Sequence, residues 1–171
     1  LSGNKYGVEG TEAMCMVHPS AIPTEKAITY ASVVCDFRLL KTEQHRCRLV
    51  VGGDKLPYAS DSAAPAANLV ESKILFNSTI SQATARFMTI DIRNFFLSSK
   101  MHNPEFMKIH TNDIPTDIHE KDKSRQFMDE KGFVYFKIIK GMYGLKQAAI
   151  LAYNQLKDNL SKHGYFPIPH T

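Results

Sequence analysis

Residues 87–99 read FMTIDIRNFFLSS, and this stretch decides how the chain is expected to fold. Alternate side chains of an extended chain point to opposite faces, so Ile90 and Ile92 fall on one face and Asp91 falls on the other. We therefore predict a β-strand over residues 86–92, with its apolar face in a core and Asp91 directed at a different surface.

The carboxylate of Asp91 needs an explanation, because a charge among apolar side chains costs free energy unless something compensates it. The residues alone offer two simple explanations. Asp91 is solvated at the end of the strand, or it forms an ion pair with Arg93 or Lys100.

The composition is typical of a globular protein with one ordinary domain. The chain has 171 residues, of which 43% are hydrophobic and 22% charged, and its net charge is +4. No apolar run is long enough to cross a membrane and no secretion signal begins the sequence, so we expect an intracellular protein, cytoplasmic or nuclear, with no membrane partner. Because the first residue is not Met, we expect a segment of a longer chain.

Three cysteines, Cys15, Cys35 and Cys47, are far apart in the sequence, and none belongs to a Cys-x-x-Cys pair. This spacing argues against a zinc knuckle. Each cysteine is predicted to be reduced and to act as a small buried hydrophobic residue.

The first half of the chain predicts a long β-hairpin followed by a helix. Residues 28–37 and 45–53 are rich in β-branched side chains, which favour the two strands of the hairpin. Residues 68–81 predict a helix, in which Asn68 and Glu71 have the spacing of a capping box.

The second half predicts two short strands and a long helix. The strands are expected at residues 105–110 and 133–139, on either side of a polar surface excursion at 111–131. The helix is expected at residues 145–164, with Gly164 at its end. One face of this helix carries an apolar residue at every fourth position, namely Ala148, Ala152, Leu156 and Leu160.

Three stretches of the sequence occur together in an informative order: RCRLVVGG at 46–53, IDIRNFFLS at 90–98 and KGMYGLKQAAILAYNQL at 140–156. They resemble the reverse transcriptase of copia-type LTR retrotransposons, which shows Arg-Leu-Val-x-x-Gly, then Asp-Val-x-Asn-Ala-Phe-Leu, then Tyr-Gly-Leu-Lys-Gln-Ala. The sequence APAANLVESKILF at 64–76 is similar to the family's Ala-Pro followed by a helix. The resemblance extends over residues 28–165 and departs from the family pattern at Phe95, where the family more often has Ala.

The resemblance implies an α+β fold that is part of the fingers and palm of a polymerase, with a long β-hairpin, antiparallel palm strands and packed helices. Residues 1–27 would be an irregular lead-in, residues 28–85 mainly fingers, and residues 86–171 fingers and palm. The family takes further carboxylates from a later Val-Asp-Asp hairpin. We therefore expect a fragment of a retrotransposon polyprotein that is inactive alone and marginally stable, because the strand at 86–92 would lack its neighbour.

The activity implied by the resemblance is RNA-directed DNA polymerisation, a metal-dependent nucleotidyl transfer. The implied partners are an RNA template, a DNA primer strand, deoxynucleoside triphosphates and the remainder of the polyprotein. Two Mg²⁺ ions assist such reactions in the complete enzyme, and Mg²⁺ takes hard oxygen ligands. Asp91 would be the catalytic metal ligand and Ile92 would add its backbone carbonyl, although this chain alone is not expected to hold the ions.

Three residues would bind the nucleotide. Phe96 would lie beneath the sugar and exclude a 2′-hydroxyl; core packing is its alternative role, and Phe95 is an adjacent competitor. Gln147 would donate to sugar or phosphate oxygens, or else face solvent in the first turn of its helix. Arg48 would hold the triphosphate, and Arg46 is its rival on the same face of the strand.

Lys140, Tyr143 and Lys146 would contact the template or primer in a salt-dependent manner that reads no base sequence. The two lysines could equally be ordinary surface residues. Three other interpretations of the chain stay open, namely a nucleic-acid-binding remnant without chemistry, an inert pseudogene product, and a basic α/β domain of unrelated function.

Overall fold

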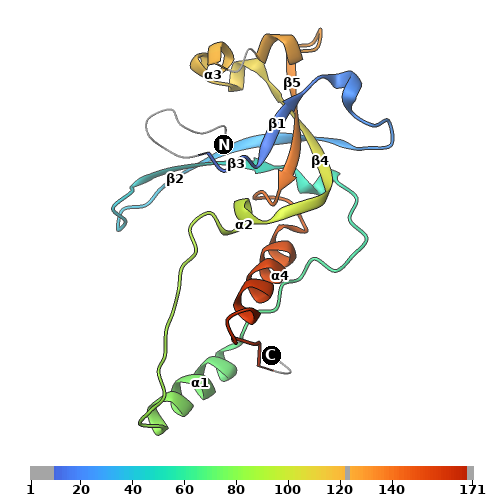
Figure 1. Ribbon diagram of the computed structural model, residues 1–171. Coiled ribbons are helices and arrows are strands. Elements are labelled where there is room, and N and C mark those ends of the chain that lie inside the picture. Colours follow the sequence, from blue (N-terminus) through green and yellow to red (C-terminus); the bar gives the residue numbers. More distant parts are fainter. Residues whose placement is uncertain (1–9, 122–123, 169–171) are drawn as a thin grey trace.

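The computed structural model describes residues 10–121 and 124–168, which form a five-stranded sheet, a helix at one end of the sheet and a second long helix on a projecting arm (Figure 1). The strands are β1 (Met14–Val17), β2 (Ile28–Phe37), β3 (His45–Val51), β4 (Lys100–His110) and β5 (Phe133–Lys140). The helices are α1 (Leu69–Ser81), α2 (Phe95–Ser98), α3 (Thr116–Lys121) and α4 (Ala148–Ser161). This mixed content confirms the predicted α+β class, while the polymerase part of that prediction stays a proposal.

The sheet has the strand order β1-β5-β4-β2-β3. The antiparallel pairing of β2 with β3 confirms the predicted hairpin, and β4 pairs antiparallel with β5. The beginning of β2 pairs with β4 in parallel, which differs from the antiparallel set that was expected. A parallel pair needs a long connection between its strands, and the chain between β2 and β4, which contains β3 and α1, provides one.

All three cysteines are exposed, so the prediction that they are buried is wrong. The physical reason lies in the sheet. Cys15 is on β1, which is an edge strand. Cys35 and Cys47 lie on the part of the β2–β3 hairpin that extends past β4, because β4 pairs with β2 only at the three residues 28–30 (Figure 1).

The central strands β4 and β5 supply six of the thirteen residues of the core cluster. β4 begins earlier than predicted, and its register against β5 shifts between Lys100 and Glu105. Pro104 lies in this interval. Because a proline has no N–H to donate to the ladder, it explains why the register shifts here. The core cluster consists of Ala13, Val51, Leu56, Met101, Met107, Ile109, Ile114, Val134, Phe136, Ile138, Met142, Leu145 and Ala148.

Strand β1 was not predicted, and the expectation of irregular chain over residues 1–27 is wrong for Met14–Val17. Residues 1–9 lie outside the described part of the chain. β1 pairs with β5 and follows Ala13, which is fully buried. Four residues are too few to show a clear alternation, so only the pairing identifies this strand.

The polar excursion at residues 111–131 agrees with its prediction. Its described residues form short helical turns at Thr111–Asp113, Thr116–Lys121 and Ser124–Phe127.

The arm, which we define as α1 together with residues 82–94, projects away from the sheet (Figure 1). The predicted capping box is present, since the backbone N–H of Glu71 donates to Asn68 Oδ1 at 2.9 Å and the Asn68 N–H donates to Glu71 Oε2 at 2.6 Å. No residue of α1 is buried. The expectation of packed helices is therefore wrong for this helix.

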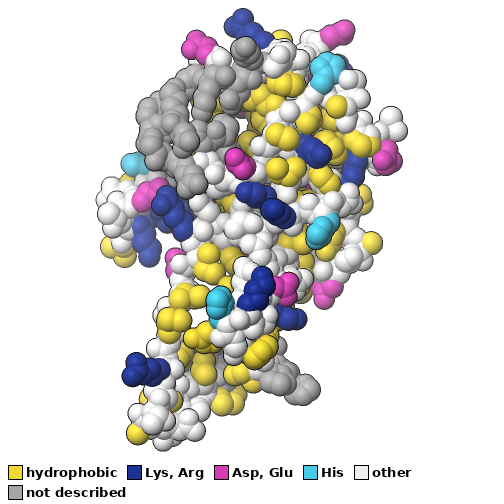
Figure 2. Space-filling model, viewed as in Figure 1, with side chains coloured by type: hydrophobic (Ala, Val, Ile, Leu, Met, Phe, Trp, Pro, Cys, Tyr) yellow, Lys and Arg dark blue, Asp and Glu magenta, His cyan; other side chains and the backbone are white. Residues whose placement is uncertain are grey.

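Residues 86–92 are extended, but they do not form the predicted strand. Every side chain in this range is exposed, including Met88 at 74%. Among the described residues no strand pairs with this segment, so neither of its faces is covered and the predicted core face has no core. Its Phe87 ring lies 4.7 Å from the Phe76 ring of α1, and Figure 2 shows hydrophobic side chains gathered over this lower part of the molecule.

Helix α4 begins at Ala148, three residues later than predicted, because residues 145–147 form a turn. It ends at Ser161, three residues earlier than predicted, and Gly164 terminates it as expected. Gly164 has a positive φ of 82°, and the N–H of Tyr165 donates to the carbonyl of Leu160 at 3.1 Å, as in a glycine-terminated helix. Ala148 and Ala152 are buried, as one face of the predicted apolar stripe requires.

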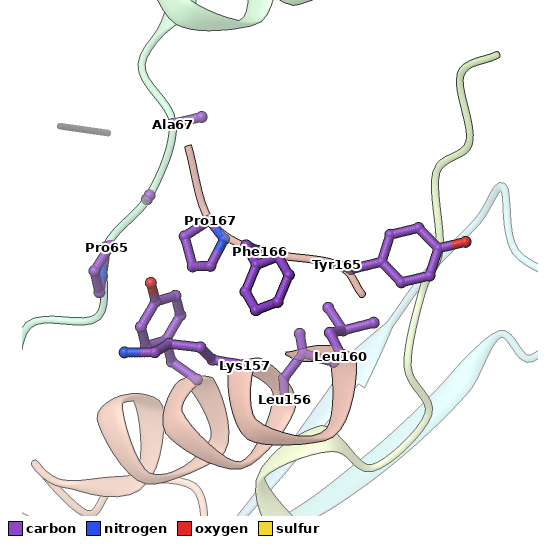
Figure 3. A pocket seen from close by; sticks show the side chains of 10 residues that line it. Pro65, Ala67, Leu156, Lys157, Leu160, Tyr165, Phe166 and Pro167 are labelled. Atoms are coloured by element: carbon purple, nitrogen blue, oxygen red, sulfur yellow. The ribbon is translucent and has the colours of Figure 1, made fainter. Parts of the chain in front are cut away.

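The remaining part of that stripe lines a cavity of about 280 Å³ between α4, residues 65–67 and residues 165–167 (Figure 3). Leu156 and Leu160 face Phe166 across it, and Lys157 reaches along its side. The lining is predominantly apolar, which fits packing of the chain after α4 back onto the helix. Among the described residues, no helix has both the length and the apolar character that a membrane crossing requires.

Candidate nucleotide and nucleic-acid interface

The first and third family-like stretches meet backbone against backbone. The N–H of Val51, at the end of β3, donates to the carbonyl of Tyr143 at 2.8 Å. A Cβ placed on Gly53 would lie 2.0 Å from the Gly144 carbonyl oxygen, and a Cβ on Gly144 would lie 2.0 Å from the Val51 carbonyl oxygen. Gly144 also has a positive φ of 94°. Only glycine fits at both positions, so these two glycines permit the contact.

Side chains from all three stretches meet beside this junction. The guanidinium carbon of Arg48 lies 5.7 Å from the centre of the Tyr143 ring. The Tyr143 ring in turn lies 5.3 Å from the Phe96 ring, edge to face, with an interplanar angle of 68°. We call Arg48, Phe96 and Tyr143 the three-motif cluster. Its members come from β3, α2 and the turn between β5 and α4.

Arg48 is held in place from two sides. Its Nη2 lies 3.3 Å from Oδ2 of Asp36 on β2, while Tyr143 stacks on its other side. Its Nε is buried without a hydrogen-bond partner in the described part of the chain. The side chain remains 33% exposed, so the guanidinium is oriented, partly desolvated and still open to an anion.

Asp36 is a member of this site that sequence reasoning missed. It is directly opposite Arg46 in the hairpin, yet its ion pair is with Arg48, two pairs further along the ladder. Arg46 and Arg48 lie on the same face of β3, as predicted. Of the two, Arg48 is the one that forms an ion pair with Asp36. The register of the hairpin would have predicted this ion pair, because residues 36 and 48 are diagonal neighbours in that register and a long side chain can reach across.

Asp91 and Ile92 lie on the arm, before α2. Asp91 is exposed, and no ion pair or hydrogen bond of its side chain is found among the described residues, so the suggested pairing with Arg93 or Lys100 does not occur. Ile92 is 38% exposed. Within residues 10–121 and 124–168, no group of three or more His, Cys, Asp or Glu side chains could hold a metal ion. The residues present therefore do not fit a pair of Mg²⁺ ions by themselves.

Gln147 directly precedes α4 and is buried, with 7% of its surface exposed. Its carbonyl accepts from the N–H of Leu151 at 3.1 Å, and its side chain makes no capping hydrogen bond to the helix. The alternative in which Gln147 faces solvent is therefore wrong. The cause is the late start of α4, which places this residue in the buried turn that follows Gly144.

The two lysines predicted to contact the template lie in different surroundings. Lys146 is exposed, and its ammonium donates to the carbonyl of Leu56 at 3.1 Å, close to the glycine junction. Lys140 is half-buried at the end of β5, and its ammonium donates to the carbonyl of Thr11. Lys146 thus links the turn after Gly144 to the chain that follows Gly53.

The neighbouring strand β2 supports the junction through two polar contacts. The buried hydroxyl of Thr29 donates to the carbonyl of Gly52 at 2.5 Å. The Tyr30 hydroxyl donates to Asp54 at 3.0 Å, and this hydrogen bond, with the negative charge of Asp54, raises the pKa of Tyr30. These contacts fix the chain on both sides of Gly53.

No protein-family model, no curated protein sequence and no solved structure matches this chain.

Proposed function

We propose that this chain is part of the fingers and palm of an RNA-directed DNA polymerase of the copia-type retrotransposon family. In this proposal it binds an RNA template with a DNA primer, and a deoxynucleoside triphosphate, through the three-motif cluster. The proposal concerns binding by this chain, and polymerisation by the complete polyprotein.

One observation carries the proposal. Arg48, Phe96 and Tyr143 come from the three stretches that resemble the family and lie more than forty positions apart from one to the next, yet their side chains meet in one place. Arg48 contacts Tyr143, and Tyr143 contacts Phe96. Convergence of this kind is expected when separate sequence motifs serve one site, and nothing in their spacing along the chain requires it.

The chemistry of the cluster fits a nucleotide. The Arg48 guanidinium binds phosphate oxygens, and Asp36 keeps it oriented until a phosphate replaces the carboxylate. The Phe96 ring, held edge-on by Tyr143, excludes a 2′-hydroxyl from the sugar position. Lys146 adds a positive charge near the same turn for a backbone phosphate of the template or primer.

Asp91 is the proposed metal-facing residue of the complete polymerase, together with the backbone carbonyl of Ile92. Asp91 is exposed, as a metal ligand must be before the metal binds. One carboxylate does not hold two Mg²⁺ ions, so we expect this chain to bind primer–template without extending the primer.

The test is fluorescence anisotropy with a labelled RNA–DNA primer–template and the full 171-residue chain at several salt concentrations. We expect binding that weakens as salt rises. Arg48→Ala should weaken binding about tenfold and lower the slope of log K against log salt by about one. Lys73→Ala, which removes one positive charge from the exposed surface of α1, is the matched control and should leave the affinity within about twofold.

Two results would contradict the proposal. One is the absence of saturable binding at low salt. The other is an equal loss of affinity in Arg48→Ala and Lys73→Ala, since binding would then reflect net charge alone.

A nucleic-acid-binding chain without chemistry in any context is the second candidate. It is favoured by the position of Asp91 on the arm, since the described residues contain no group of three or more His, Cys, Asp or Glu side chains that could hold a metal ion. Primer extension with Mg²⁺ by a polyprotein that contains this chain distinguishes the two candidates. Activity that Asp91→Asn abolishes supports the polymerase, and activity that survives this change removes Asp91 from the metal site.

A further inference from the structure

Cys35 and Cys47 are directly opposite each other in the β2–β3 hairpin. The hydrogen bond from the N–H of Arg38 to the carbonyl of Gln44, at 2.7 Å, marks that pair as a hydrogen-bonded position of the ladder. Hydrogen-bonded and non-hydrogen-bonded pairs alternate along an antiparallel ladder. Counting back three pairs, Cys35 and Cys47 therefore occupy a non-hydrogen-bonded pair, where side chains approach most closely.

This position suits a covalent bond between the two sulfurs. Opposite Cα atoms of a non-hydrogen-bonded pair are about 4.5 Å apart. Disulfides span Cα separations of about 4.4–6.8 Å, so no movement of either strand is required. Both cysteines are exposed and reduced in the structure, which leaves them accessible to a reagent in solution.

The two thiols already interact. A hydrogen bond with the Cys47 thiol is the largest effect that raises the pKa of Cys35, and partial desolvation and the negative charge of Asp36 act in the same direction. Cys35 therefore keeps its proton more firmly than an ordinary cysteine.

We propose that Cys35 and Cys47 form a dithiol site that closes to a cross-strand disulfide by exchange with a low-molecular-weight disulfide such as oxidised glutathione. The thiolate of one cysteine attacks one sulfur of the reagent, forms a mixed disulfide and releases one thiol. The opposite cysteine then loses its proton and attacks the protein sulfur of the mixed disulfide, which releases the second thiol. The chain loses two protons and two electrons in total, and the reagent gains them.

The third cysteine provides an internal control. Cys15 lies on β1, where its partner in the ladder is Lys137 and not a cysteine. A mixed disulfide at Cys15 therefore has no resolving thiol in its own ladder, and it should persist as an adduct.

The experiment treats the reduced 171-residue chain with oxidised glutathione, blocks the remaining thiols with iodoacetamide, and identifies the products by intact mass and tryptic mapping. In Cys15→Ser, which removes the competing thiol, we expect a mass lower by about 2 Da and no lasting adduct. The tryptic peptide of residues 27–38 should be joined to the dipeptide 47–48. Cys35→Ser and Cys47→Ser should each leave a stable glutathione adduct on the remaining member of the pair.

A comparison of the folded and the unfolded chain shows whether closure of the disulfide depends on the hairpin geometry or only on the short distance between the two cysteines in the sequence. In urea, the ratio of internal disulfide to adduct should fall at least about tenfold, because the register that aligns the two sulfurs is lost. The proposal is overturned if the folded Cys15→Ser chain accumulates adducts without closing. It is equally overturned if closure is as efficient in urea as in the folded protein. Thermal melts of the serine variants check that each still folds.

Discussion

The sheet and the arm have equally clear local sequence patterns, but they differ in how far their apolar side chains are buried. Residues 86–92 alternate apolar and polar side chains at least as clearly as β5 does, and α1 has a complete capping box. Yet Ile138 of β5 is fully buried, while Met88 is 74% exposed. The local pattern was enough to form helix α1 but not a strand over residues 86–92, and burial of either segment requires a second element beside it.

The consequence is energetic. Burying an aliphatic side chain contributes about 1.5–3 kcal/mol, and this contribution is available in the sheet but not in the arm. The same kind of substitution should therefore have a large effect in one region and almost none in the other.

Gly144→Ala should be the most disruptive change. The new Cβ would lie 2.0 Å from the Val51 carbonyl oxygen, at a residue with a φ of 94°. We expect a loss of at least about 3 kcal/mol in the free energy of unfolding, measured by urea denaturation. Gly164→Ala is the matched control, because Gly164 has a φ of 82° but no atom near the position of its Cβ, and it should lose only about 1 kcal/mol. Equal losses would show that backbone conformation, and not the glycine junction, sets the cost.

Met107→Ala and Ile80→Ala compare a large apolar side chain in each region. Met107 is fully buried in β4, so its truncation should lower the free energy of unfolding by about 2–5 kcal/mol. Ile80 is 84% exposed on α1, so its truncation should change that free energy by less than about 0.5 kcal/mol. A comparable loss in the Ile80 variant would mean that the arm packs against something in solution, and the contrast between the two regions would fail.

Asp129 should make the stability of the sheet depend on pH. Its carboxylate accepts from the N–H of Phe133, the hydroxyl of Tyr135 and the N–H of Lys131, and with the charge of Lys108 these contacts hold the pKa of Asp129 below its ordinary value. A lowered pKa in the folded state adds stability that is fully present above the ordinary pKa near 3.8 and is lost as the pH falls through the lowered value.

Asp129→Asn removes this dependence. At neutral pH the variant should melt at a lower temperature than the unchanged protein, and the difference between the two melting temperatures should narrow as the pH falls below about 4. Melting curves recorded between pH 7 and pH 3 measure this difference. A difference in melting temperature that stays constant over this range would show that the carboxylate charge contributes nothing and that only the shape of the side chain matters.

The contrast also explains how far the sequence could predict the structure. The hairpin, β5, the capped start of α1 and the glycine end of α4 depend on nearby residues, and all four were predicted. The exposure of Cys35 and Cys47 and the missing pairing of residues 86–92 depend on which strand lies beside them, a long-range property that the local pattern does not contain.

The candidate site shows the same division. Arg48, Phe96 and Tyr143 were identified singly, from motifs that the resemblance supplied, but their mutual contact was not. Asp36 was overlooked because its role depends on a diagonal ion pair across the hairpin. Asp91 was expected on the face of a strand opposite the core, and it lies on the arm, where no strand among the described residues pairs with its segment.

Asn68→Ala should have the smallest effect on the stability of the whole molecule, and its effect should be confined to α1. Asn68 accepts the N–H of Glu71 and begins α1, so its loss should cost the helix about 1 kcal/mol. Because no residue of α1 is buried, the helix should loosen without changing the urea midpoint of the sheet. Hydrogen exchange of the amides in Leu69–Ser81 measures this, and protection there should fall about fivefold.

Asn77→Ala, in the interior of the same helix, is the matched control with the opposite sign. Its side chain makes no capping contact, and alanine has the higher helix propensity, so protection of the same amides should rise. If Asn68→Ala also lowered the midpoint for the sheet, α1 and the sheet would unfold as one cooperative unit. The separation of the molecule into a buried body and an independent arm would then be wrong, although every local contact of the capping box would remain as described.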